Sequence, residues 1–307
     1  MAVNQPTRGP RSAPSRSWKP AALMVVAALI LTAHAVITWR SLRQGDGLRL
    51  LRVTDGQELA LRDALGELSA ARLLFLGEFH DQPSHHQAQL AVIRALHEVD
   101  HPLAIGLEMF RAEDQETLDQ WVAGTLSLEH FLPLYYANWN FPWALYRDIF
   151  LYAREHRIPL VGLNVPLGLV QQVARAGFRS LAPEQLERLP MVRCVVDEQY
   201  EEFIRRAMGM HSTGGREFTH FCEAQLMWDT VMAINLLDYL EQHPTTTVAV
   251  LAGQGHAWKG GIPSQVRQRV EVPMQVVVPM LPARLQQVEV LPGDADFLWL
   301  GLELQGR

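Results

Sequence analysis

After about residue 48, short apolar runs alternate with longer amphipathic segments. The apolar runs are typical of buried strands. They predict strands at residues 72–76, 103–107, 159–163, 247–251, 276–278 and 288–290. Helical periodicity predicts helices at residues 83–99, 112–122, 143–156 and 217–241. A β-prone lead-in and a helix precede them at residues 48–70. This alternation predicts an α/β fold, with a largely parallel central sheet flanked by helices on both faces.

The first 39 residues have a different pattern. Residues 1–19 form a basic polar tail, and residues 20–39 are free of charged side chains. About 20 such residues span a bilayer as a helix, so residues 20–39 are expected to be a membrane anchor or a signal peptide. Both alternatives place the body outside the cytoplasm of a bacterium, either anchored in the inner membrane and facing the periplasm or exported after cleavage. Residues 48–307 are expected to form one α/β domain.

Composition sharpens this division of the chain. The protein has 307 residues, of which 48% are hydrophobic, and this excludes intrinsic disorder. Its formal net charge of −6 is unevenly distributed. Residues 1–52 carry eight basic residues and one acidic residue, so the remainder has a net formal charge of −13. A body this acidic is not expected to bind nucleic acid, which requires positive charge to neutralise phosphates.

Polar or ionisable residues follow four of the predicted strands. They are Glu78 with His80, then Glu108, Asn164 and His256. Ligands of open parallel sheets bind beyond the carboxyl ends of the strands, so these side chains are expected to converge on one site there.

The residue types at this edge allow two kinds of chemistry. Glu78, His80, Glu108 and His256 could bind a divalent transition metal or the iron of a porphyrin, because neutral imidazole and carboxylate are common ligands. The same four residues could be catalytic without a metal, with a carboxylate orienting a histidine that accepts a proton. His85 and His86, at the start of the next helix, are possible additions to a ligand site.

Two further segments could contribute to the site. Gln225 and Asp229 lie four residues apart on the predicted helix at 217–241 and therefore share a face, where Asp229 is a lone acid among apolar neighbours. It could orient a histidine or form a structural hydrogen bond. The aromatic segment 131–146 could cover a flat apolar ligand, although a contribution to the core is the stronger interpretation.

Five ordered sequence blocks resemble the ChaN-like family. The blocks are Gly77-Glu78-Phe79-His80-Asp81 with His85-His86, Gly106-Leu107-Glu108-Met109-Phe110, Leu163-Asn164-Val165-Pro166, Glu223-Ala224-Gln225 with Asp229, and Gly253-Gln254-Gly255-His256 with Gly261-Ile262-Pro263. The resemblance covers roughly Leu73 to Arg269. It implies an α/β fold related to the Tiki/TraB and erythromycin-esterase-like superfamily.

The resemblance also implies a function. ChaN-like proteins are extracytoplasmic haem-binding proteins of iron acquisition, so we expect an exported, membrane-associated protein that binds haem and could form a homodimer. The alternative is a metal-dependent hydrolase of the peptidase or esterase type. The expected cofactor-binding residues are His80, His85, His86, Asn164, Gln225, Asp229 and His256.

The chain departs from the family in one respect. Lipoproteins of the family carry a cysteine near the end of the signal segment, and residues 33–39 contain none. Any anchor would therefore have to be residues 20–39 themselves. A tyrosine associated with haem in the family has three candidates here, Tyr136, Tyr146 and Tyr200.

Overall fold

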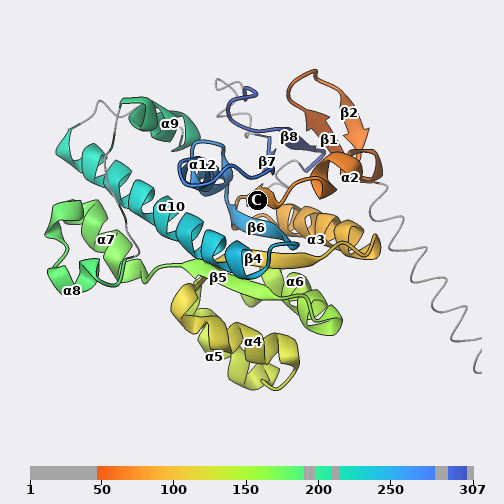
Figure 1. The fold of residues 1–307 in the computed structure, drawn as a ribbon, viewed down its shortest axis with the longest axis horizontal. Helices are drawn as coiled ribbons and strands as arrows, with labels where there is room; N and C mark the ends of the chain where they lie inside the picture. Colours follow the sequence, from red (N-terminus) through yellow and green to blue (C-terminus); the bar gives the residue numbers. More distant parts are fainter. Residues whose placement is uncertain are drawn as a thin grey trace, which may run out of the picture. The chain divides into compact units, whose positions relative to one another are not determined.

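A mostly parallel eight-stranded sheet organises the part of the chain that the structure describes. The structure is a computed structural model, and it describes residues 47–189, 192, 196, 198–208, 215–280 and 290–302. The strand order is β2-β1-β8-β7-β3-β6-β4-β5 (Figure 1). The strands are β1 (Arg49–Arg52), β2 (Glu58–Ala60), β3 (Leu73–Glu78), β4 (Leu103–Arg111), β5 (Leu160–Asn164), β6 (Thr247–Gly253), β7 (Met274–Pro279) and β8 (Phe297–Leu300). Only β1 pairs antiparallel, with β2 and β8, so the predicted parallel sheet is confirmed.

Helices cover both faces of this sheet. The helices whose buried residues join the first core cluster are α2 (Leu61–Ser69), α3 (Pro83–Glu98), α4 (Gln115–Ala123), α5 (Leu128–Asn138) and α6 (Trp143–His156). Those on the other face are α10 (Arg216–Gln242), α11 (Gln254–Ala257) and α12 (Ile262–Arg267). Helices α7 (Leu167–Ala176), α8 (Pro183–Leu186) and α9 (Glu198–Met208) complete this side, where α7 and α9 pack against α10 (Figure 1). Two short 3₁₀ turns are η1 (Ala112–Asp114) and η2 (Phe178–Ser180).

The alternation of side chains along each strand separates the two cores. In β3, Leu74 and Leu76 join the core beneath α3 and α6, whereas Leu73 and Phe75 join the core beneath α10. Successive residues of a strand point to opposite faces, so a sheet covered on both sides needs apolar residues at every position. This is why the strands appear in the sequence as continuous apolar runs.

Three parts of the predicted element pattern have different outcomes. Helix α5 overlaps segment 131–146, and Phe131 and Tyr135 of this helix are buried, so the core interpretation is confirmed for these two residues. Pro133 lies inside α5, and a proline at that position argues against a helix when only the sequence is read. The final strand is β8, which the sequence reading missed. The predicted strand at 288–290 lies outside the described residues except for Val290, which is in no strand.

The predicted anchor or signal segment at residues 20–39 lies outside the described residues. Within the residues that are described, no helix combines the length and the apolar character needed to span a bilayer.

Candidate functional site

The site is built around Glu78, the last residue of β3. Glu78 follows Leu74 and Leu76 at two-residue spacing, so its side chain points to the face covered by α3 and α6. There its Oε2 accepts a hydrogen bond from Gln89 Nε2 at 2.8 Å and lies 3.0 Å from His86 Nδ1. Its Oε1 accepts a very short hydrogen bond from the Tyr146 hydroxyl. A fully buried carboxylate is thus held in place by donors from two helices.

His80 extends this arrangement towards the edge of the sheet. Its Nδ1 lies 2.8 Å from Glu78 Oε1, and its ring contacts the rings of Trp139 and Phe141 at centroid distances of 4.9 and 5.0 Å. The side chain is 26% exposed, whereas that of Glu78 is fully buried. His80 is therefore the solvent-facing end of a buried hydrogen-bonded chain. We call Tyr146, Glu78 and His80 the Glu78 triad.

A second hydrogen-bonded set of a tyrosine, a carboxylate and a histidine lies at the same edge of the sheet, on the opposite face. Asp229 of α10 is buried, and its Oδ1 lies 2.6 Å from His256 Nδ1. Its Oδ2 accepts a hydrogen bond from the hydroxyl of Tyr200, on α9, at 3.2 Å. His256 follows β6 in α11, and its ring contacts the indole of Trp228 at a centroid distance of 4.6 Å. We call Tyr200, Asp229 and His256 the Asp229 triad.

Glu108 of β4 lies between the two triads. Its Oε1 is 3.9 Å from His80 Nε2 and 3.7 Å from His256 Nε2, and its Oε2 accepts the backbone N–H of Gly253 at 2.5 Å. Strand β6 separates β3 from β4 in the sheet, so Gly253 lies between the two glutamates. A Cβ at Gly253 would approach His80 Cε1 to 2.9 Å, and this close contact explains the glycine. The two imidazole Nε2 atoms thus converge on one carboxylate oxygen.

The protonation of the site follows from this pairing. Burial alone would raise the pKa of Glu78, but hydrogen bonds from His80 and His86 and their positive charges lower it well below its usual range. Burial opposes the charged form of His256, yet the carboxylates of Glu108 and Asp229 raise its pKa to about 9. The pKa of His80 is also raised despite burial, because Glu78 accepts its hydrogen bond and Glu108 lies near. His256 is therefore an imidazolium at neutral pH.

The two adjacent histidines contact the segment between β3 and α3. His85 Nδ1 accepts the backbone N–H of Phe79 at 2.9 Å, and burial lowers its pKa to about 4. His86 is buried against Glu78 and Gln89, and its Nε2 lies 3.2 Å from the backbone carbonyl of His80. A cofactor-binding role for either residue stays a prediction.

Asn164 and Gln225, the other two predicted cofactor-binding residues, are placed differently from each other. Asn164 donates to the backbone carbonyl of Glu108 at 2.5 Å and accepts from the Trp228 indole N–H at 2.6 Å, so it positions the chain around the site. Gln225 is half-buried on α10, and no contact with the cluster is described for it. Its neighbour Glu223 accepts the backbone N–H of Phe178 at 2.8 Å instead. Asp229, one helical turn further on, is the residue of this helix that reaches the site.

The structure does not support the predicted metal site at Glu78, His80, Glu108 and His256. Among the described residues, no group of three or more His, Cys, Asp or Glu side chains is placed to hold a metal ion. Glu78, one of the four predicted ligands, is already contacted by Tyr146, Gln89, His80 and His86, so its two oxygens are directed at these side chains.

Sequence reasoning missed the parts of the triads that come from packing. Tyr146 and Tyr200 were candidates only as haem contacts, and the structure shows them as donors to carboxylates. Gln89 was not identified, because a glutamine in an amphipathic helix gives no signal of its own. Tyr136 remains exposed on α5, where its hydroxyl oxygen accepts the backbone N–H of Trp143 at 3.1 Å. Cys222 is a buried free thiol, and Cys194 lies outside the described residues.

The fold and the site define an α/β protein with a buried carboxylate–histidine cluster at the carboxyl edge of its parallel strands. A family model described as haem-binding uptake, Tiki superfamily, ChaN matches residues 64–266. The chain therefore belongs to the ChaN family, and the resemblance stated from its sequence blocks is confirmed.

Solved structures resemble the chain at low sequence identity. A structure of ChaN of Campylobacter jejuni, described as binding haem cofacially, is 19% identical, covers 82% of this chain and 96% of its own, and has a TM-score of 0.64. This likeness confirms the fold. An erythromycin esterase mutant in its open conformation is 16% identical, with 82% of each chain covered and a TM-score of 0.46. A protein from Bacillus cereus is 12% identical over 73% of this chain and 70% of its own, with a TM-score of 0.43. No curated protein matches the chain.

Proposed function

We propose that the protein is an exported haem-binding protein of iron uptake, anchored in the inner membrane through residues 20–39. The observation that carries the proposal is the family match over residues 64–266, because that family is described as haem-binding and as acting in uptake. The Campylobacter relative is described as binding haem. The apolar segment 20–39 and the four basic residues that precede it support export and anchoring.

The carboxylate–histidine cluster does not fit haem as an axial-ligand set. Haem iron in proteins takes a ligand from His, Cys, Met or Tyr. The Nδ1 atoms of His80 and His256 are bonded to carboxylates, so only the Nε2 atoms could bind iron, and both of these face Glu108 within 4 Å. We therefore derive no ligation from these two histidines.

Titration of the full-length protein with haemin tests the proposed function. We expect a shifted and sharpened Soret band that saturates at a fixed stoichiometry, which haemin in the same detergent without protein does not show. A protein that leaves the haemin spectrum unchanged at every ratio would refute haem binding.

Fusion of a periplasm-dependent reporter after residue 47 tests export. Alkaline phosphatase fused there is expected to be active and membrane-bound, and deletion of residues 20–39 should abolish its activity. Equal reporter activity with and without the segment would contradict an exporting role for residues 20–39.

The cluster itself favours a second candidate function, acid–base hydrolysis of an ester without a metal. Each histidine has its Nδ1 held by a carboxylate, so its Nε2 is oriented towards a common point beside Glu108. In this scheme His80 accepts a proton from the water that attacks the ester carbonyl. The imidazolium of His256 donates a hydrogen bond to the carbonyl oxygen on which negative charge develops. As the C–O bond of the ester breaks, His80 returns the proton to the departing alcohol oxygen. His80 takes the first role because it is the more exposed of the two.

Hydrolysis of p-nitrophenyl acetate with and without EDTA tests this candidate. If the cluster is catalytic, His80→Ala should lose roughly 10²- to 10⁴-fold in rate. The matched control is His97→Ala, since His97 contacts Tyr152 away from the cluster. The rate should not respond to EDTA. Activity that EDTA abolishes, or that survives His80→Ala, would contradict a metal-free site at the cluster.

A further inference from the structure

Two histidines outside the carboxylate–histidine cluster lie together where α3 and α6 end. His97 is in the last turn of α3, His156 is the last residue of α6, and the two helices pack against each other on one face of the sheet. The centroids of the two imidazole rings are 4.8 Å apart and the rings are tilted by 59°, so they are close but not stacked. His97 is half-buried and His156 is exposed, so the pair is open to solvent.

The spacing of the two rings matches that of two imidazoles on one metal ion. A metal–nitrogen distance of about 2.0–2.1 Å places the ring centroid about 3.2 Å from the metal. The centroids of two such rings are roughly 4.5–5.2 Å apart when the nitrogen–metal–nitrogen angle lies between about 90° and 109°, the square-planar and tetrahedral values. The observed 4.8 Å lies within this range, so α3 and α6 already hold the two rings at a distance that suits chelation.

The contacts of the pair leave ring nitrogens for a metal. His97 Nδ1 lies 3.1 Å from the hydroxyl of Tyr152, on α6. Histidine ligands commonly bond their second ring nitrogen to such a group, which fixes the tautomer and leaves Nε2 for the metal. The ring of His156 packs on that of Tyr152 at a centroid distance of 4.1 Å, and no hydrogen bond of its ring nitrogens to the described residues is present. Tyr152 therefore contacts both histidines and orients the pair.

The charges around the pair also favour a cation. Glu98 and Glu155 are sequence neighbours of the two histidines, and both carboxylates are exposed. Arg94 adds one positive charge over the Tyr152 ring, at 5.1 Å, so the two carboxylates outweigh it. The C-terminal ends of α3 and α6 carry partial negative charge, which stabilises a positive charge nearby. Burial, and after it the positive charges nearby, lowers the pKa of His156, which favours the neutral imidazole that a metal binds.

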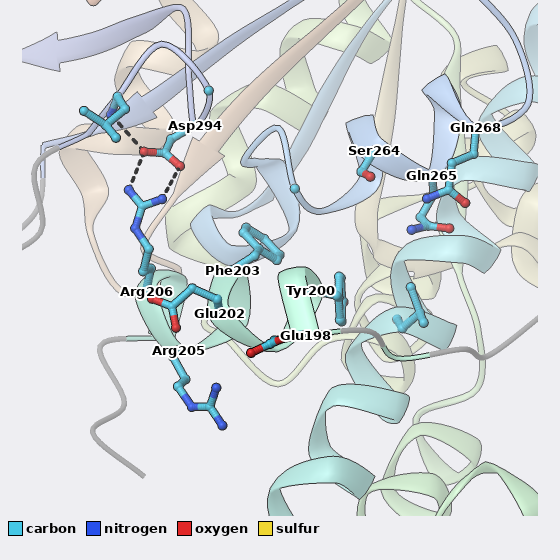
Figure 2. Close-up of a pocket in the computed structure, with 14 residues that line it drawn as sticks. Glu198, Tyr200, Glu202, Phe203, Arg205, Arg206, Ser264, Gln265, Gln268 and Asp294 are labelled. Atoms are coloured by element: carbon cyan, nitrogen blue, oxygen red, sulfur yellow. Dashed lines mark hydrogen bonds and ion pairs between the residues drawn. The ribbon is translucent and has the colours of Figure 1, made fainter. Parts of the chain in front are cut away.

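A cavity with acidic side chains, on the other face of the sheet, is the competing place for a cation. It has a volume of about 840 Å³ between α9, α10, α12 and the segment that leads into β8, and Figure 2 shows its Arg206 directed at Asp294. The carboxylates of Glu198 and Glu202, which also line it, are exposed. Carboxylates suit Mg²⁺ and Ca²⁺, whereas imidazole suits Cu²⁺, Ni²⁺ and Zn²⁺. A metal that prefers imidazole therefore distinguishes the histidine pair from this cavity.

We propose that His97 and His156 form a two-histidine site for a divalent transition metal that prefers imidazole, with Cu²⁺ the tightest. Water would complete the coordination, so the pair is compatible with the lack of a three-residue ligand group among the described residues. A metal bound there would join the C-terminal ends of α3 and α6, the two helices that hold Glu78 in place. The site is separate from the carboxylate–histidine cluster and does not depend on haem binding.

Calorimetric titration of the full-length protein with Cu²⁺, without haemin, tests the site. We expect His97→Ala and His156→Ala each to weaken the tightest Cu²⁺ site by more than about tenfold. The double variant should lose little more than either single variant, because chelation needs both imidazoles and the two losses are not additive. Tyr152→Phe keeps the ring but removes the hydroxyl beside His97, so about tenfold weaker binding is expected.

Two further variants are the matched controls. His130→Ala removes an exposed histidine of α5 that contacts Ser127, and Glu202→Gln removes a carboxylate of the cavity; both should bind Cu²⁺ as the wild type does. Thermal unfolding followed by circular dichroism establishes that each variant is folded before it is compared. Equal Cu²⁺ affinity in the wild type and the folded double variant would refute the site. Weakened binding in Glu202→Gln, with both single histidine variants unaffected, would place the cation at the cavity and refute it as well.

Discussion

The Glu78 and Asp229 triads each consist of a tyrosine, a carboxylate and a histidine, and their histidines face Glu108 from opposite sides. The triads differ in which end is exposed to solvent. In the Glu78 triad the tyrosine is fully buried and the histidine side chain is 26% exposed. In the Asp229 triad the histidine side chain is 9% exposed, and the tyrosine is half-buried. Identical hydrogen-bonding chemistry therefore presents an imidazole to solvent in one case and a phenol in the other.

The difference follows from how many groups hold each carboxylate. Glu78 is contacted by four side chains, two of them from α3 and one from α6, so its triad is anchored in the core. Asp229 is contacted by His256 and Tyr200, and Tyr200 comes from α9 at the margin of the fold. We infer that the Glu78 triad is a rigid support for His80, whereas the Asp229 triad is held less firmly. The predictions below test this distinction, beginning with the largest effect.

Removing the two carboxylates should have unequal costs. Glu78→Ala leaves Tyr146, Gln89, His80 and His86 without their common acceptor and should lower the free energy of unfolding by about 3–5 kcal/mol, as the breaking of buried ion pairs does. Asp229→Ala leaves only His256 and Tyr200 without their common acceptor and should therefore lower the free energy of unfolding by less. Urea denaturation of both variants measures the difference. Glu78→Gln is the conservative control and should fall between wild type and Glu78→Ala. An Asp229→Ala variant that is the less stable of the two would reverse the ranking of the triads.

The two triads should affect the stability of the protein in different pH ranges. The pKa of Glu78 is lowered in the folded protein, so its contribution is present above its unfolded pKa of 4.5 and is lost as the pH falls below that value. The pKa of His256 is raised from 6.5 to about 9, so its contribution is fully present below pH 6.5 and is lost as the pH rises through 9. Stability should therefore fall on both sides of neutral pH.

Two variants test which residue causes the loss of stability on the acid side (the acid limb) and on the alkaline side (the alkaline limb) of neutral pH. Glu78→Gln should flatten the acid limb and His256→Gln the alkaline limb, when the midpoint of urea unfolding is measured across pH. Imidazole titration by NMR should give His256 a pKa that falls towards its ordinary value in Glu108→Gln, since the Glu108 charge is the largest of the influences that raise it. A His256 resonance that titrates near its ordinary value in the wild type would contradict the ion pairing described here.

The sequence predicted the centre of this site better than its surroundings, for a physical reason. Glu78, His80, Glu108 and His256 were found because each follows a strand, and parallel topology brings strand ends together. Asp229 stood out as a lone acid in an apolar helix. The identity of its partner, and of Tyr146 as the partner of Glu78, depends on how α6 and α10 pack on the sheet. Local pattern does not determine that packing.

The same limit applies to the contacts of the two adjacent histidines. His85 and His86 were considered as ligands because histidine is a versatile residue type. Their contacts depend on the segment after β3, where His85 accepts from the backbone N–H of Phe79 and His86 contacts Glu78.

Gly253 should be more important to the Glu78 triad than to the Asp229 triad. In Gly253→Ala the added Cβ would lie 2.9 Å from His80 Cε1 and 3.0 Å from His80 Nε2, so the ring or the backbone must move. Overpacking of this kind costs about 1–3 kcal/mol. Gly66→Ala, in α2 with nothing within 4 Å of the new Cβ, is the matched control and should stabilise the protein by about 0.5–1 kcal/mol. NMR should show the larger shift at the His80 resonances, and equal shifts at His256 would contradict the proposed selectivity.

The smallest difference should lie between the two tyrosine hydroxyls. Tyr146→Phe removes a donor from a fully buried carboxylate and should cost about 1.5–3 kcal/mol, the range for hydrogen bonds to charged groups. Tyr200→Phe removes a 3.2 Å hydrogen bond made by a half-buried side chain, where a solvent molecule can replace the lost donor, and should cost about 0.5–1.5 kcal/mol.

Urea denaturation of the two phenylalanine variants measures this difference, because each variant removes one donor and keeps the aromatic ring. The Tyr146 side chain is fully buried, whereas Tyr200 is half-buried, so the loss of free energy of unfolding should be larger for Tyr146→Phe. If Tyr200→Phe costs as much as Tyr146→Phe, the two carboxylates are held equally firmly and the distinction between the triads is wrong.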